Sequence, residues 1–524
     1  MRRLSVLTAI TALVAGLLAG LFPGSASAAT TYSAAPASSW IPNGTVRAIA
    51  VTPTTIYIGG EFTSLRHPYT GAVVTRSHLA AIDRATGNPT SWNPAPNSYD
   101  SDEQPPIATI AVGPDGMVYV GGDFTSIGGV TRIHAAAVTP AGAVTSWRAD
   151  TDASLGHVWD MAVSGTKLYM VGQFNTVNGQ SRDGAARVDL SNGAVDAWDA
   201  HLSGRAQAVA VTGSTVVLGG TFTAIGGAAR SYLGSVDTAT GAVSSWAPAT
   251  QCDSGIICRI RDLAVNGSQV YAAIGGEPGG RAAAWTLGMD NPMWKDVTDG
   301  EVQTLDYFDG VVYLGGHFSA AIRDSAHQSP NPAVNRNQFA AVDAATGLVL
   351  PYALPTSNPA LPGLWAIHAD ASGLRIGGGT TLTSGPFARF LTFAATGVTV
   401  PGPVAPPTTT VTVKTKGCKT CLVRVNSRRG SSSWSSPWVK AKGGVTTFSV
   451  WTSRTVGLTV QVKAPWERKQ KNNAEVVMRY KGKKVGQKVS AKVAAAMKKA
   501  TSCYAGTSAR SLKFTVQVKK VKAG

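Results

Sequence analysis

Short apolar runs separated by glycine- and aspartate-containing turns follow one another along the first four hundred residues. The unit that starts at Ile107 shows the pattern clearly. Its first run ends at a Gly-Pro-Asp-Gly turn, its second ends at Gly121-Gly122, a third run of small residues follows Arg132, and a fourth ends at Trp147. Four short strands with turns between them, in about fifty residues, are typical of one β-propeller blade.

The arginine of this unit recurs, and its period predicts the architecture. The arginines are 56, 50, 48, 51, 55 and 53 residues apart, at Arg76, Arg132, Arg182, Arg230, Arg281, Arg336 and Arg389. This period predicts an all-β fold, a seven-bladed β-propeller over residues 29–400. A residue repeated in every blade indicates a scaffold role, such as donation to strand-end carbonyls. Because the last unit lacks the terminal tryptophan, we predict that a strand around Trp40 completes the last blade.

The two ends of the chain differ from this repeat in composition. Residues 1–28 hold two arginines, an apolar stretch and a final Ala-Ser-Ala, which predicts a secretory signal peptide. We therefore expect a secreted, extracellular or cell-wall-associated protein without a membrane span. Residues 29–410 carry 19 basic and 27 acidic side chains, whereas residues 411–524 carry 26 basic and 2 acidic ones. The net charges of −8 and +24 indicate an acidic propeller joined to a strongly basic domain.

A proline- and threonine-rich linker, residues 401–410, separates the two domains in the sequence. In the basic domain, residues 411–524, Leu512, Phe514, Val516 and Val518 alternate with polar residues, as in a half-buried strand. This domain is therefore predicted to be β-rich, most simply a small β-sandwich. A short helix is expected over residues 490–499.

Five cysteines in an exported chain predict disulfides. Cys252 and Cys258 close a short loop and are expected to pair. Cys418, Cys421 and Cys503 all fall in the basic domain, and the pairing among them stays open. Cys418 and Cys421 have the spacing of a zinc half-site, but all eight histidines precede them, which favours a structural disulfide. No metal or other cofactor is predicted.

Candidate ligand-binding residues of the propeller fall in two groups. The residue two positions after each arginine varies from unit to unit, as expected where a repeat protein individualises a site. Two units also carry longer loops before the arginine, and loops on a rigid scaffold are common binding elements. Surface elaboration alone would explain these loops equally well. The candidates are His78 and His134 in the first group and His67, Tyr69, Arg323 and His327 in the loops.

The basic domain interleaves aromatic and cationic residues, which suits stacking on sugars or bases together with charge neutralisation of phosphates. Some of these tryptophans are expected to be core residues of the sandwich instead. The predicted polyanion-binding residues are Arg428, Arg429, Trp434, Trp438, Lys440, Arg468, Lys469 and Lys471.

Two repeated segments carry a resemblance to a known family. The segments 56–63 (Ile-Tyr-Ile-Gly-Gly-Glu-Phe-Thr) and 118–125 (Val-Tyr-Val-Gly-Gly-Asp-Phe-Thr) resemble the bacterial delta-60 repeat propellers over residues 46–397. This resemblance implies a secreted propeller from a family largely without assigned activity. It carries over no catalytic residues.

No catalytic motif stands out: there is no Gly-x-Ser-x-Gly elbow, phosphate loop or His-Glu-x-x-His segment. The leading hypothesis is an exported, monomeric, non-enzymatic binding protein. Its basic domain would dock on an anionic cell-wall polymer, and its propeller would present a face to a protein or glycan. The alternatives are a carbohydrate-active enzyme with its site at the propeller mouth and an extracellular nucleic-acid-binding protein.

Overall fold

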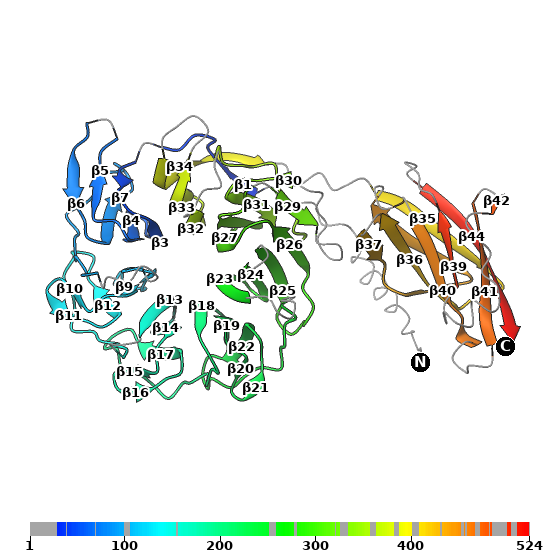
Figure 1. Cartoon of the computed structure of the whole chain (residues 1–524), viewed down its shortest axis with the longest axis horizontal. Helices are drawn as coiled ribbons and strands as arrows, with labels where there is room; N and C mark the ends of the chain where they lie inside the picture. Colours follow the sequence, from blue (N-terminus) through cyan, green and yellow to red (C-terminus); the bar gives the residue numbers. More distant parts are fainter. Residues whose placement is uncertain are drawn as a thin grey trace, which may run out of the picture. The chain divides into compact units, whose positions relative to one another are not determined.

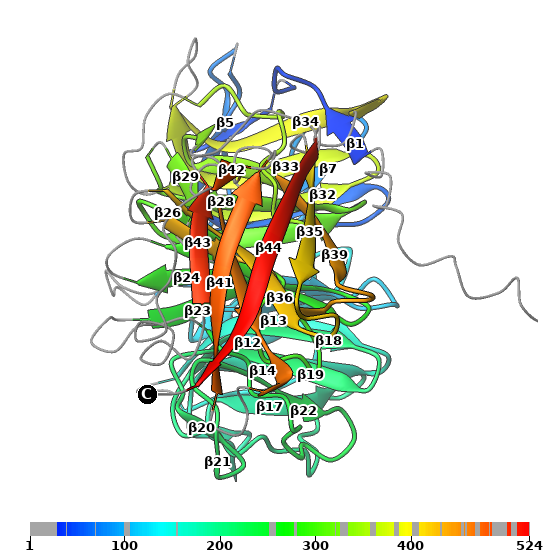
Figure 2. The same cartoon turned by 90° about the vertical axis from the view of Figure 1, so that its right-hand side faces the viewer.

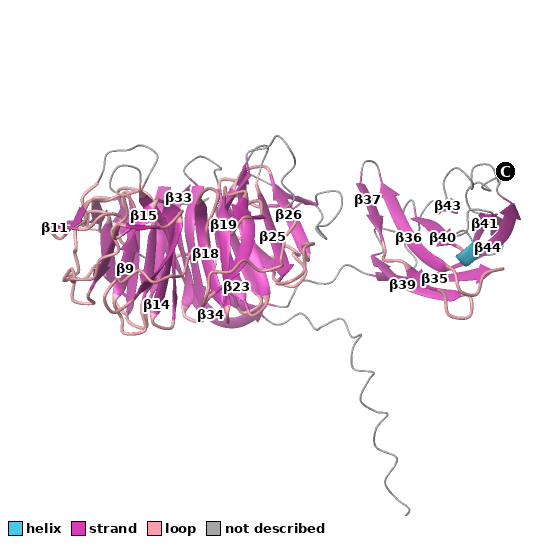
Figure 3. Cartoon of the chain, turned by 90° about the horizontal axis from the view of Figure 1, so that it is seen from below, coloured by secondary structure: helices cyan, strands magenta, loops and turns pink. Residues whose placement is uncertain are grey.

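The structure is a computed structural model in which the backbone is described for most of residues 29–522. The described part has gaps at residues 38, 69, 99–104, 153–155, 251–257, 277–279, 320, 325–333, 357–362, 382–386, 401–407, 430–431, 452–454, 456–457, 467–471, 481–482, 485–499 and 505–510. The chain forms two compact units, residues 1–323 with 329–403, and residues 324–328 with 404–524. Strands dominate both units (Figure 3).

In the described residues of the first unit, seven sheets surround one axis (Figure 1). Each innermost strand contacts the innermost strands of the two neighbouring sheets, and the last contacts the first, so the ring is closed. The predicted seven-bladed propeller is therefore confirmed. The innermost strands are β3 (Val46–Val51), β8 (Thr109–Val112), β13 (His157–Ser164), β18 (Ala206–Thr212), β23 (Cys258–Asn266), β27 (Val302–Phe308) and β32 (Gly363–Asp370).

The other blade strands follow outward in antiparallel order. The second strands are β4 (Thr55–Gly60), β9 (Val118–Gly121), β14 (Lys167–Gln173), β19 (Thr215–Gly220), β24 (Gln269–Gly276), β28 (Val311–Gly316) and β33 (Gly373–Thr381). The third strands are β7 (Leu79–Asp83), β12 (Ala135–Val138), β17 (Ala185–Asp189), β22 (Leu233–Asp237), β25 (Arg281–Thr286), β31 (Phe339–Asp343) and β34 (Phe387–Val400). Blade five adds β26 (Trp294–Thr298) as a fourth strand.

Small hairpins follow the second strand in several blades. They are β5 (Ser64–Arg66) with β6 (Val73–Thr75), β10 (Ser126–Ile127) with β11 (Val130–Thr131), β15 (Thr176–Val177) with β16 (Gln180–Ser181), β20 (Ala224–Ile225) with β21 (Ala228–Ala229), and β29 (Ala321–Asp324) with β30 (Val334–Asn335). In blade one, β2 (Ile41–Pro42) also pairs with β5.

The repeated Gly-Gly pair lets the chain pack closely in two directions. A Cβ on Gly219 would lie 2.5 Å from Cγ2 of Ile260, which belongs to the innermost strand of the next blade. A Cβ on Gly220 would lie 2.2 Å from the carbonyl oxygen of Arg205, at the start of its own blade. The first glycine therefore allows neighbouring blades to approach, and the second allows the two strands of one blade to meet.

The repeated arginines hold the outer part of the blade together, as their scaffold role predicts. Arg230 donates from Nε to Trp246 O (2.8 Å), from Nη1 to Ala229 O (2.8 Å) and from Nη2 to Ser244 O (2.7 Å). Equivalent donations to backbone carbonyls are made by Arg76, Arg132, Arg182 and Arg336. The prediction is confirmed for these five blades.

Two arginines of the repeat are placed differently. Arg281 lies inside strand β25, where it pairs with Ile274 and Val297. Only four residues separate it from Gly276, which is too few for the hairpin that precedes the arginine in other blades. Arg389 donates to the carbonyl oxygen of Asn43 and so connects the last blade to the first.

The N-terminal segment closes the ring. Strand β1 (Ala29–Tyr32) pairs antiparallel with β34 as the outermost strand of blade seven, and Ala37 pairs with Thr392. Trp40 then donates from Nε1 to Asn88 Oδ1 in blade one (3.1 Å), just as Trp92 donates to Thr139 O in blade two (3.0 Å). The predicted N-terminal closure is confirmed, and its strand pairing extends further toward the N-terminus than Trp40.

The second unit is a β-sandwich of two sheets, as the alternating pattern predicts. One sheet has the order β39 (Val445–Trp451), β35 (Thr408–Lys416), β44 (Ser511–Lys522), β41 (Asn472–Tyr480), β42 (Lys483–Lys484), and Figure 2 shows β44 between β35 and β41. The other contains β37 (Ser432–Ser435), β36 (Leu422–Arg429), β40 (Leu458–Lys463) and β43 (Ala500–Tyr504), with β38 (Val439–Lys440) beside β36. Alternate apolar residues of both sheets form the core, Leu512, Phe514, Val423 and Val460 among them.

The first described strand of this unit begins earlier than the sequence analysis expected. Strand β35 begins at Thr408, so Thr408–Thr410 belong to the sandwich and not to the predicted linker 401–410. Their β-branched side chains suit the pairing with β39. The rest of the linker and the predicted helix over 490–499 lie outside the described residues.

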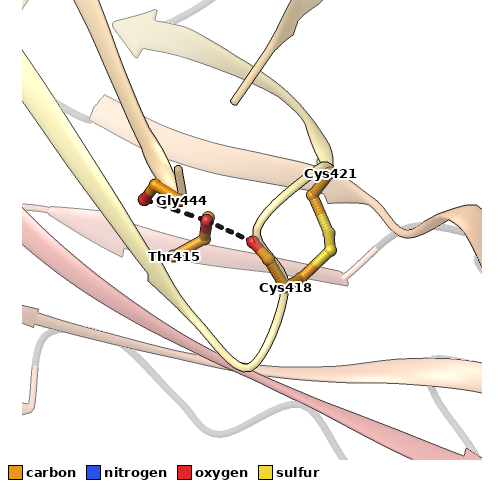
Figure 4. The surroundings of a disulfide bond; sticks show 4 residues. All are labelled: Thr415, Cys418, Cys421 and Gly444. Atoms are coloured by element: carbon orange, nitrogen blue, oxygen red, sulfur yellow. Dashed lines mark hydrogen bonds between the residues drawn. A yellow bond between two sulfur atoms is a disulfide. The ribbon is translucent and has the colours of Figure 1, made fainter. Parts of the chain in front are cut away.

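A disulfide joins Cys418 and Cys421 at the turn after β35 (Figure 4). Thr415 donates from Oγ1 to the carbonyl oxygen of Cys418 at 2.7 Å, and its Oγ1 also lies 3.1 Å from Gly444 O. The two sulfurs are therefore bonded to each other and do not form the zinc half-site. Cys503 lies in β43. Cys258 is disulfide-bonded, and Cys252, its predicted partner, lies outside the described residues.

Candidate ligand site at the mouth of the channel

The innermost strands begin with an irregularity that places one residue outside the strand ladder. In blade one Val46 pairs with Gly60 and Ala48 with Gly59, so Arg47 is a β-bulge. The same shift occurs in β13, β18, β23, β27 and β32, and β8 begins directly after the equivalent residue. The seven residues at this position line one cavity of about 700 Å³ on the ring axis: Arg47, Ala108, Trp159, Gln207, Arg261, Gln303 and Trp365.

Two guanidinium groups of this set flank one indole ring. Cζ of Arg47 lies 3.8 Å from the ring centre of Trp365, and Cζ of Arg261 lies 5.8 Å from it. Burial lowers the pKa of both arginines, and the neighbouring charges of Arg259 and Arg47 lower the pKa of Arg261 as well. The positive charges of Arg47 and Arg261 are therefore close together in a partly buried environment.

Two glutamates partly balance these arginines. Nη2 of Arg47 is 2.6 Å from Oε1 of Glu61, the residue after the Gly-Gly pair of blade one. Nη2 of Arg261 is 3.0 Å from Oε2 of Glu301, and Nε of Arg259 is 3.9 Å from Oε1 of the same glutamate. Three guanidinium groups thus share two carboxylates.

Two half-buried aspartates also line the cavity and connect neighbouring blades. Oδ2 of Asp160 accepts the backbone N–H of Val209 in the next blade (2.8 Å). Oδ2 of Asp262 likewise accepts the N–H of Leu305 (3.0 Å) and the hydroxyl of Thr304 (2.8 Å). Burial raises the pKa of Asp160 to about 7, with a further contribution from Asp262, and burial raises the pKa of Asp262 to about 6.

Several polar atoms at the mouth lack hydrogen-bond partners among the described residues. They are Nε of Arg259 and Arg261 and Oε1 of Gln207 and Gln303. Gln303 is only 5% exposed. Buried polar groups are normally satisfied, so a concentration of free donors and acceptors around one cavity is typical of a binding site.

His78 and His134, two of the ligand-binding residues predicted from the sequence, lie outside this cavity's lining. His78 and His134 are buried at left-handed backbone positions, with φ of 63° and 64°. Nδ1 of His78 lies 3.2 Å from Gly60 O and that of His134 lies 2.6 Å from Thr151 Oγ1. Burial lowers the pKa of both histidines, to about 4 for His134.

The predicted loop residues are described only in part. His67 belongs to the turn of the β5–β6 hairpin, where its Nδ1 accepts the N–H of Thr70 (3.1 Å) and its ring packs edge-on against Trp40. Arg323 lies in β29. Tyr69 and His327 lie outside the described residues. Blades one and six do flank blade seven, as predicted; the ligand role of these four residues stays a prediction.

The predicted polyanion-binding residues lie in the sandwich. Arg428 and Arg429 end β36, and Trp434 lies in β37, where it pairs with Ser427. Arg424 Cζ lies 4.7 Å from the ring centre of the half-buried Trp438, and Lys440 is exposed in β38. Arg468, Lys469 and Lys471 lie outside the described residues.

The sandwich also carries a basic face that the sequence analysis did not single out. In β35 and β44, residues alternate between buried and outward-facing positions, and the two strands pair in parallel. The outward-facing residues include Lys414, Lys416, Lys513 and Lys519, all exposed, with threonines between them. We call these four lysines the lysine face.

The channel-mouth residues were missed, although the repeat contained a signal for them. The residue before each bulge is apolar, for example Val46 or Val302, and the residue two positions after it is also apolar, for example Ile49 or Leu305. At the bulge position itself the residue is arginine, tryptophan, glutamine or alanine. It is a variable position within a constant frame, the feature that was expected two positions after the repeated arginine.

Comparison with known proteins supports the fold and little beyond it. Residues 113–143 match a family model described as "Domain of unknown function (DUF5122) beta-propeller". No curated protein matches the chain. None of the helices in the described part of the chain is long and apolar enough to cross a membrane.

Solved structures similar to the chain, all at low identity, include one propeller. The computationally designed Ika8 protein is 11% identical, with a TM-score of 0.42, and the match covers 68% of this chain and 98% of that one. The Dos1 propeller is 12% identical (TM-score 0.37; 79% and 94% covered), and Sqt1 of Saccharomyces cerevisiae is 9% identical (TM-score 0.36; 70% and 99% covered). The protein is an all-β propeller protein, and these likenesses assign no ligand.

Proposed function

We propose that this protein is an exported, non-enzymatic binding protein of the delta-60 repeat type, which docks on an anionic cell-wall polymer through its basic sandwich. The propeller is the recognition part, with its site at the mouth of the channel. The observation that carries the docking role is the charge of residues 411–524, which contain 26 basic and only two acidic side chains.

The lysine face gives this charge a suitable geometry. Alternate residues of a strand are about 6.6 Å apart, so Lys414 and Lys416 on β35 and Lys513 on β44 form a regular array of cations. Positive charges held this close repel one another unless a polyanion neutralises them. A repeating phosphate polymer such as teichoic acid supplies evenly spaced anions, so it fits the array better than an isolated acidic group would.

The test is a wall-binding assay with the mature chain, residues 29–524, across a salt series. We expect binding to Gram-positive walls, loss of binding after teichoic acid is stripped, and a steep fall with salt, because neutralising phosphates releases counterions. The triple variant Lys414→Gln, Lys416→Gln, Lys513→Gln should bind at least tenfold more weakly.

The matched control is Lys419→Gln, Lys442→Gln, Lys463→Gln, which removes the same charge from exposed positions outside β35 and β44. Equal losses in both variants would mean that total charge, and not the lysine face, determines docking. Binding that survives both stripping and high salt would refute polyanion docking and favour recognition of the glycan itself.

A further inference from the structure

We propose that the mouth of the propeller channel binds a small hydroxylated anion, a sugar phosphate or a sugar acid, between the arginines and the amides of the bulge position. This inference rests on the proposed role of the propeller as the recognition part and specifies its ligand. It draws on the described residues that line the 700 Å³ cavity.

The first argument is the charge of the lining. Arg47, Arg259 and Arg261 share the carboxylates of Glu61 and Glu301, and burial shifts Asp160 and Asp262, the two aspartates of the lining, toward their neutral form by raising the pKa of each. The N–H groups at Nε of Arg259 and Arg261 are buried without an acceptor among the described residues. An oxyanion would supply acceptors to both, and arginine suits such planar, multivalent contacts better than lysine does.

A fourth arginine lies at the rim of the same cavity. Arg205 is exposed and precedes the bulge residue of blade four by two positions. It forms no ion pair with any residue in the described part of the chain. Its charge is therefore available to a ligand at little cost to the protein's own contacts.

The second argument is the pair of free acceptors. Oε1 of Gln207 and of Gln303 is buried without a donor among the described residues, and Gln303 is 95% buried. A fully deprotonated inorganic anion such as sulfate has only acceptors and cannot satisfy these oxygens, whereas hydroxyl groups donate to them. The combination of free N–H donors with free amide acceptors therefore selects a ligand that carries both an anionic group and hydroxyls.

The size of the cavity agrees with this class. About 700 Å³ lies within the range of small-molecule sites, roughly 300–1,000 Å³. The cavity is fixed by seven separate strands, so a ligand there would meet a largely preformed surface.

The test is isothermal titration calorimetry on residues 29–524 with glucose 6-phosphate, glucuronate, glucose and sulfate as probes. We expect glucose 6-phosphate or glucuronate to bind, whichever anion the site prefers, and glucose to bind at least tenfold more weakly. Binding of neither hydroxylated anion would overturn the proposal. So would binding of glucose with equal affinity.

Two variants locate the site. Arg205→Gln should weaken binding of the preferred anion about tenfold, because a charge-assisted contact is lost. Arg148→Gln removes the same charge from a surface pair with Asp150 outside the cavity and should change the affinity less than twofold. Equal losses in the two variants would overturn the proposed site.

Gln303→Met keeps the side-chain length and removes the amide. It should weaken binding of the hydroxylated anion roughly three- to tenfold and leave binding of sulfate unchanged. Unchanged affinity for both probes would overturn the role assigned to the amides. Because Arg205→Gln should still bind walls and the lysine-face variant should still bind the small anion, failure of this inference is distinguishable from failure of wall docking.

Discussion

Removal of the Tyr32 side chain tests the closure of the ring. Tyr32 is 3% exposed in β1, and its ring lies 5.8 Å from that of Tyr313 and 6.3 Å from that of Tyr352. Its hydroxyl donates to the carbonyl oxygen of Asp370 at 3.1 Å. Large aromatic-to-alanine changes in a core cost about 3–5 kcal/mol, so Tyr32→Ala should destabilise the propeller by about 4 kcal/mol.

This loss can be converted into a shift in Tm. Near 60 °C, unfolding entropy is about 2.1 cal/mol/K per residue, so a propeller of roughly 370 residues that unfolds as one unit has about 0.8 kcal/mol/K. A loss of about 4 kcal/mol then lowers Tm by about 5 °C in differential scanning calorimetry. Tyr32→Phe, which loses only the hydrogen bond worth about 1 kcal/mol, should lower Tm by about 1 °C. If the alanine and phenylalanine variants melt together, β1 is not packed as a blade strand and the closure argument fails.

Three further predictions concern the blades. Arg230→Met should lower the free energy of unfolding in urea by about 2–3 kcal/mol through loss of its hydrogen bonds to carbonyls, whereas the exposed Arg148→Met should change it by less than about 1 kcal/mol. Gly121→Ala should cost about 1–3 kcal/mol, because the new Cβ would lie 2.7 Å from Val158 Cγ1; an unchanged urea midpoint would contradict the interblade role of this glycine. Asp160 keeps a proton in the folded state that the unfolded chain releases near pH 4, so its contribution to stability is full at low pH and is lost as pH rises toward its folded pKa of about 7. Asp160→Asn should therefore make unfolding free energy less dependent on pH between 4 and 7, and an unaltered slope would refute this assignment.

The ring was predictable because the same pattern of strands and turns recurs in each sequence repeat. The arginines could be assigned to the scaffold for the same reason, and Arg281 departs where the sequence is too short for a hairpin before it. The channel mouth was harder to predict. The bulge at Arg47 or Trp365 arises where one strand pairs with the Gly-Gly pair of the next strand. Residue preferences along one strand therefore do not predict it. The disulfide partner of Cys421 was left open because linear spacing does not fix which sulfurs meet.

The pairing of β1 with β34 sets an order of events during synthesis. Ala29 pairs with Val400, so the first strand of the ring to leave the ribosome meets its partner only after the whole propeller has been made. Until β34 has been synthesised, β1 has no partner strand. Its unpaired edge is the kind of surface that promotes association between chains. Contacts between distant positions also form slowly. The pairing of β1 with β34 therefore cannot precede synthesis of residues 387–400, and a chain truncated before residue 387 would contain an open ring.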